Sequence, residues 1–154
     1  MDKNLEIPTD PLAAIYAEKI RPLRTRSCLL EIPERENDVR ILHTLLGIEL
    51  QVGRRRFTCP DLPTARYMRV FARLGCREFA IPYDITKIST LADELETAWQ
   101  RSLLISETES ADSTGQQRKR NRTRLFKSVR SQLAEIGPGE RMPEFKQSTK
   151  QRND

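Results

Sequence analysis

Residues 48–59 read IELQVGRRRFTC, and this stretch decides the fold class that the sequence predicts. Within it, residues 48–52 alternate apolar and polar side chains, which is the pattern of a half-buried strand. Gly53 can adopt the positive φ of a tight turn, so that residues 54–59 return as a second strand. The stretch therefore predicts a β-hairpin.

Two amphipathic helices are expected after this hairpin. The first covers residues 61–74, because Asp61 can cap its N-terminus and Gly75 can end it. The second covers residues 90–104, where apolar side chains follow helical spacing and Thr90 opens a variant of the capping box.

The segment between these helices, Phe79 to Tyr83, again alternates apolar and other residues. Pro82 has no backbone N–H to donate, so this segment is expected to be an edge strand or to place Pro82 at a strand end.

Three further elements are expected before the hairpin. A helix is predicted at 11–21, with Asp10 as its cap and a proline at its first position. The short apolar run 28–32 favours a buried strand. Residues 38–46 spread apolar side chains over a wide arc, which predicts a buried helix closed by Gly47.

These elements predict an α+β fold. A small mixed or antiparallel sheet that includes the 48–59 hairpin should be packed by three to four helices, with a separate basic amphipathic helix at the C-terminus. The expected organisation is a flexible N-terminus at 1–7, a compact domain at 8–105, a flexible linker at 106–121, the basic helix at 122–136 and a disordered tail at 137–154.

Charge and polarity suggest the linker and the tail. Residues 106–117 contain one apolar side chain and no aromatic one, which is typical of a flexible segment. Residues 117–154 hold 11 Lys and Arg against 4 Asp and Glu, whereas residues 1–116 hold 16 against 18. The basic excess therefore lies entirely in the C-terminal part, and it favours an anionic partner.

The cations at and before the predicted C-terminal helix are the first candidate contacts to phosphate. Arginine binds phosphate in bidentate fashion, and binding releases counterions. The candidates are Arg118, Lys119, Arg120, Arg122, Arg124, Lys127 and Arg130. The plainer interpretation is a solvated basic tail whose helix packs on its own domain.

The same helix carries an apolar stripe that needs a surface to cover it. The stripe consists of Leu125, Phe126, Val129, Leu133 and Ile136. It could pack on the domain, a partner's groove, a second copy or a membrane interface.

A second basic candidate lies on the helix expected at 61–74. Arg66, Arg69 and Arg73 fall within an arc of about 60° at 100° per residue. Arg54, Arg55 and Arg56 on the hairpin could extend this surface. The plainer interpretation is an ordinary polar face whose arginines pair with nearby carboxylates.

No residue pattern predicts catalysis. His43 is the only histidine, and it is expected at the edge of the 38–46 helix. The three cysteines lack metal-site spacing, and no glycine-rich phosphate loop or nucleophile elbow is present. We therefore expect no cofactor, no metal and no catalytic residue.

Compartment and function follow from these points. We expect a cytoplasmic protein, because no apolar run is long enough to span a bilayer and the N-terminus lacks a hydrophobic signal region. The predicted function is non-catalytic binding of nucleic acid, DNA or RNA, or of another polyanion. Its alternatives are an interaction or assembly factor that docks the apolar stripe on a partner, such as an acidic protein, and thirdly an uncharacterised enzyme; contact with an anionic membrane is less favoured.

Overall fold

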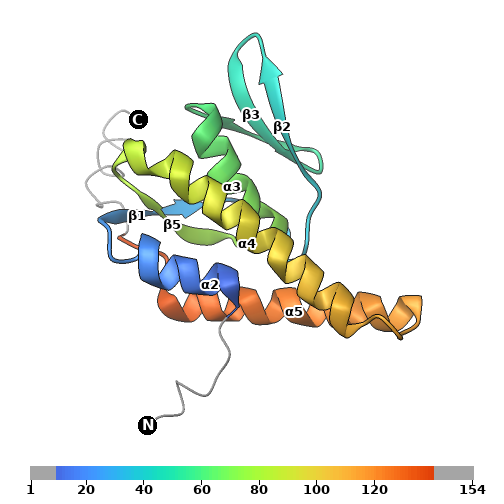
Figure 1. Ribbon diagram of the computed structural model, residues 1–154. Coiled ribbons are helices and arrows are strands. Elements are labelled where there is room, and N and C mark those ends of the chain that lie inside the picture. Colours follow the sequence, from blue (N-terminus) through green and yellow to red (C-terminus); the bar gives the residue numbers. More distant parts are fainter. Residues whose placement is uncertain (1–9, 141–154) are drawn as a thin grey trace.

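Two small antiparallel sheets and four helices make up residues 10–140, the part of the chain that the computed structural model describes (Figure 1). The α+β class predicted from the sequence is confirmed. The flexible N-terminus expected at 1–7 lies outside the described residues, and so does the part of the expected tail at 141–154.

The larger sheet has three strands in the order β2-β3-β4. Leu50 lies in its centre, opposite Ile41 on one neighbouring strand and Phe57 on the other. The hairpin predicted at 48–59 is confirmed as the β3–β4 pair. The strands are β2 (Val39–Thr44), β3 (Gly47–Val52) and β4 (Arg55–Cys59).

The helix predicted at 38–46 is wrong, because β2 occupies most of this range. Dense apolar runs do not distinguish a buried helix from a strand by periodicity. Here pairing with β3 decides for the strand, and Leu45 and Leu46 form the exposed turn between them. Gly47 is thus the first residue of β3 and does not end a helix.

The central helix is α3 (Leu62–Leu74), as predicted. The carboxylate of Asp61 accepts a hydrogen bond from the Thr64 N–H at 2.8 Å, which caps the first turn. Gly75 ends the helix in the left-handed conformation. One side of α3 packs on the three-stranded sheet and another on α4.

The smaller sheet pairs β1 (Thr25–Leu29) with β5 (Glu78–Pro82) in antiparallel fashion. The strand expected at 28–32 begins earlier and ends at Leu29. Pro82 is the last residue of β5, in agreement with the strand-end prediction.

Two buried tyrosines from helices satisfy the outer backbone groups of β5. The Ala80 N–H donates to the Tyr16 hydroxyl at 2.8 Å, and the Tyr67 hydroxyl donates to the Ala80 carbonyl at 2.6 Å. Burial raises the pKa of Tyr16 to about 12 and raises that of Tyr67 well above its ordinary value. Both hydroxyls therefore stay protonated and act as substitutes for a neighbouring strand.

The N-terminal helix begins as predicted, since the Leu12 N–H donates to the carboxylate of Asp10 at 2.9 Å. The start of the helix predicted at 90–104 needs correction. Asp84 caps a short turn that leads into the helix, which begins at Ile88 and does not use Thr90 as its cap. The elements are α2 (Pro11–Ile15), its π-helical continuation η1 (Tyr16–Ile20), η2 (Ile85–Lys87) and α4 (Ile88–Glu109).

The linker predicted at 106–121 is replaced largely by helix. Helix α4 continues to Glu109, and α5 (Gly115–Ile136) begins after a short turn. Thr114 caps α5 by accepting a hydrogen bond from the Gln117 N–H at 3.1 Å. In Figure 1, α4 and α5 meet at this turn and diverge away from it, and α2 lies between them at the other end.

The chain does not leave the domain at the end of α5. The Ser27 N–H donates to the Glu140 carbonyl at 2.6 Å, and the Glu140 N–H donates to the Thr25 carbonyl at 3.2 Å. Residues 137–140, which composition assigned to the tail, therefore lie along the free edge of β1.

Candidate polyanion-binding surface

Helix α5 is attached to the domain through its apolar stripe. Phe126, Val129 and Leu133 are buried, and Leu125 and Ile136 are partly buried. The Phe126 ring stacks on that of Trp99 on α4, with 4.9 Å between centroids. The stripe is thus covered by the chain's own domain. Of the surfaces that the sequence allowed for it, this is the one that the structure shows.

A row of small side chains lets α4 and α5 approach each other. Ser106 on α4 and Ser110, which directly follows the last residue of α4, are four residues apart, and both are buried. The Asn121 amide donates to the Ser110 hydroxyl at 2.8 Å. The small polar side chains that suggested a linker therefore belong to the contact between α4 and α5.

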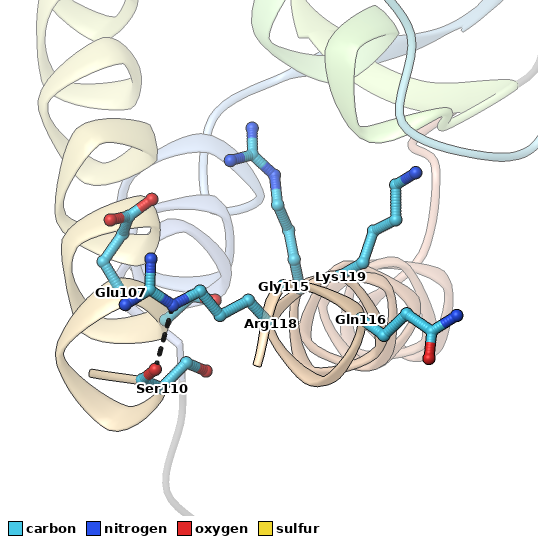
Figure 2. Close-up of a pocket in the computed structure, with 8 residues that line it drawn as sticks. Glu107, Ser110, Gly115, Gln116, Arg118 and Lys119 are labelled. Carbon is cyan, nitrogen blue, oxygen red and sulfur yellow. Dashed lines mark hydrogen bonds between the residues drawn. The ribbon is translucent and has the colours of Figure 1, made fainter. Parts of the chain in front are cut away.

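Arg118 contributes to the same contact. Its guanidinium donates to the carbonyls of Ser110 and Ala111, each at 3.1 Å, at the C-terminal end of α4. Figure 2 shows Arg118 extending from α5 to that end, whereas Lys119 and Gln116 point away from α4. A cation at a helix C-terminus is stabilising because it satisfies free carbonyls and opposes the negative end of the dipole.

Two more of the predicted phosphate contacts also hold the helix in place. Arg122 donates to both oxygens of the Glu36 carboxylate, at 2.9 and 2.6 Å, and these hydrogen bonds raise its pKa. Arg130 donates to the Leu74 carbonyl at the end of α3, at 2.7 Å. Both guanidinium groups are thus occupied by intramolecular partners.

The remaining cations of α5 lie on one exposed face, which we name the α5 outer face. All of its side chains are exposed, and none makes a hydrogen bond or an ion pair within residues 10–140. Since α5 rises about 1.5 Å per residue, its cations extend over about 12 Å. The α5 outer face consists of Gln116, Lys119, Arg120, Thr123, Arg124 and Lys127.

The arginine row on α3 faces α4. Arg66 donates to Asp93 and, at 2.7 Å, to Glu96, and Arg69 donates to Glu96 as well. Arg73 lies over the Trp99 ring, 5.8 Å from its centroid, and burial lowers its pKa. These arginines join two helices, and the side chains of Arg66 and Arg69 are largely covered.

The hairpin arginines are exposed, but two of them have partners. Arg55 pairs with Glu31 at 3.0 Å, and Arg56 pairs with Glu49 at 3.4 Å. Arg54 lies in the β3–β4 turn. The three-stranded sheet and α5 lie on opposite sides of the molecule (Figure 1), so the structure does not merge the predicted basic surfaces into one.

The groups considered for chemistry are dispersed. His43 is exposed on β2, opposite Ile48, and not at the edge of a helix. Burial raises the pKa of Cys59 to about 11 and that of Cys76 to about 12. Within residues 10–140 no three His, Cys, Asp or Glu side chains are grouped to hold a metal ion. No helix in the described range is long and apolar enough to cross a membrane.

Glu96 makes stability depend on pH. Burial alone would raise the pKa of Glu96, but hydrogen bonds from Arg66 and Arg69 outweigh it and lower the pKa. Its contribution is therefore complete above the unfolded value of about 4.3 and is lost as pH falls through the lower folded value. Glu96→Gln should lower stability at pH 7 and weaken the acid dependence below about pH 5 in urea unfolding.

Glu135→Gln, at an exposed position of α5, is the matched control for this measurement. It should leave both the stability at pH 7 and the acid dependence close to those of the unmodified protein. Equal acid dependence for Glu96→Gln and the unmodified protein would contradict the stabilising role of the Arg66–Glu96–Arg69 cluster.

No protein-family model matches this chain, and no curated protein or solved structure is significantly similar to it. Sequence reasoning identified the four cations of the α5 outer face. It did not separate them from Arg118, Arg122 and Arg130, because no sequence signal reports which arginines bind carbonyls or carboxylates within the fold.

Proposed function

We propose that this protein is a non-catalytic binding protein that contacts nucleic acid or another polyanion through the α5 outer face. The observation that carries the proposal is the division of the cations on α5. Arg118, Arg122 and Arg130 are engaged inside the fold, whereas Lys119, Arg120, Arg124 and Lys127 are exposed and have no partner within residues 10–140.

Electrostatics supports an anionic ligand for these four side chains. Arg120 and Arg124 are spaced i, i+4 on α5, and Arg124 and Lys127 are spaced i, i+3, so their like charges repel each other without a counter-charge. Phosphate groups would remove that penalty and release the counterions that the polyanion holds. Binding should therefore stabilise α5 as well as the complex.

The other predicted contacts have lesser parts in this proposal. Arg66, Arg69 and Arg73 contact α4, so a ligand would have to displace existing partners to reach them. Arg54, Arg55 and Arg56 are accessible but lie on the sheet. Docking of the apolar stripe on a partner protein would require α5 to leave its own domain, and no contact in the described residues favours that.

Salt dependence of binding is the experiment that tests this proposal. Each phosphate neutralised contributes about −0.9 to the slope of log K against log salt for B-form DNA. Four contacts give a slope of about −3 to −4. Replacing Lys119, Arg120, Arg124 and Lys127 by Gln should remove most of the slope and most of the affinity for a labelled generic duplex in anisotropy titrations.

The matched control replaces four exposed cations on other elements, namely Arg35, Arg40, Lys87 and Arg101, by Gln. It changes the net charge equally and should retain most of the slope. If the two variants lose equal affinity and equal slope, net charge alone explains binding, and the α5 outer face is rejected as the binding surface.

A further inference from the structure

We infer that the polyanion is a double-stranded nucleic acid, held by its phosphate backbone along the α5 outer face, and not a single strand. This inference rests on the proposed function and names its ligand class. It follows from two features of the described residues: the aromatic rings are unavailable for base stacking, and the row of cations is rigid.

Single-strand binding surfaces combine cations with aromatic side chains on which bases stack. No side chain of the α5 outer face is aromatic. The ring nearest in sequence, Phe126, is buried and stacks on Trp99. Tyr83 is the one exposed Phe, Tyr or Trp side chain in residues 10–140; it follows β5, and the Arg24 guanidinium lies over its ring, 4.9 Å from the centroid. The surface therefore offers charge without a stacking platform.

The cation row is held in place at both ends. Arg118 binds the end of α4, Arg122 binds Glu36, and Phe126 anchors the helix on Trp99. A double helix presents one phosphate per about 3.4 Å of axis on each strand, so a row of about 12 Å spans about four of them. A rigid row fits this fixed array, whereas a single strand must lose conformational freedom to follow it.

Acidic side chains limit where the duplex can lie. Glu107, Glu109 and Asp112 are exposed at the end of α4 and in the turn that precedes α5. They repel phosphates from the N-terminal end of the α5 outer face. The duplex should therefore contact residues 119–127 and stop short of the turn, so Glu109→Gln with Asp112→Asn should tighten binding.

The test compares three ligands of equal length with the full chain: duplex DNA, single-stranded DNA of the same sequence, and duplex RNA. With equal affinities at 1 M salt, four contacts with slopes of about −0.9 per phosphate for duplex and −0.7 for single strands give about sixfold tighter duplex binding at 0.1 M salt. Phosphate recognition also predicts little dependence on base sequence. The Gln variant of the four cations should abolish the difference.

Each result decides something. Preference for either duplex supports the inference, and the two duplex arms show whether B-form or A-form geometry is bound. Equal or tighter single-strand binding overturns the duplex assignment but leaves the proposed function standing. Binding to heparin alone also overturns the duplex assignment and leaves a polyanion-binding protein. Binding to none of these ligands at low salt overturns both.

Discussion

Replacing Phe126 by alanine is expected to lower the free energy of unfolding by about 3–5 kcal/mol, the usual cost of removing a buried phenylalanine. Phe126 is 1% exposed and stacks on Trp99, so its loss leaves a cavity where α5 meets α4. Trp99 is the only tryptophan of the chain. Its fluorescence should therefore shift to longer wavelength as α5 loosens, and urea unfolding gives the free energy.

Leu104→Ala is the control for this substitution. Leu104 is 65% exposed on α4, and its truncation should change stability by no more than about 0.5 kcal/mol. If Phe126→Ala leaves both the tryptophan emission and the unfolding free energy unchanged, α5 is not docked through Phe126. The separate basic helix predicted from the sequence would then be the better description.

Gly75→Ala is expected to destabilise the protein by about 2–5 kcal/mol, through left-handed backbone strain and overpacking together. Gly75 has φ +82°, and a Cβ there would overlap the backbone of Arg35. This approach is close because the loop that contains Asn37 covers the end of α3. The Asn37 N–H donates to the Arg73 carbonyl at 3.0 Å, and its amide donates to the Ala72 carbonyl at 3.1 Å.

Gly53→Ala separates the two causes. Gly53 also has a positive φ, +62°, but nothing lies within 4 Å of the position of its Cβ. Its substitution should cost about 1–2 kcal/mol, the strain alone. Thermal or urea unfolding of both variants measures the difference. Equal losses at the two positions would mean that the loop carrying Arg35 does not lie against Gly75.

Local signals in the sequence predicted the parts of the fold that depend on local chemistry. Asp10 and Asp61 cap helices, Gly75 ends α3, and the alternation around Gly53 forms the β3–β4 hairpin. Each of these features is determined within a few residues, by a side chain that accepts from the backbone or by a glycine at positive φ.

Errors arose where a distant part of the chain decides the structure. Residues 39–44, within the range predicted as a helix, form a strand because β3 pairs with them, and apolar spacing alone does not report that partner. The segment that contains Ser106 and Ser110 was predicted to be a linker because small polar side chains are typical of solvated chain. In the structure they let α5 pack closely on α4.

The candidate site shows the same limit. Exposed and internally bound arginines have the same appearance in a sequence. Arg122 and Arg124 are two residues apart, yet Glu36 engages the first and no described group engages the second. The sequence therefore predicts a basic helix. Only the tertiary contacts show which of its cations are free to bind a ligand, namely those of the α5 outer face.

Mapping the ligand contacts residue by residue is the sharpest test of whether the α5 outer face binds a polyanion. Amide chemical shifts of the isotope-labelled full chain would be followed while a short generic duplex is added at low salt. We expect the largest changes within residues 116–127, and we expect them to fade as salt is raised. Changes centred on Arg54–Arg56, or no saturable change at any residue, would contradict it.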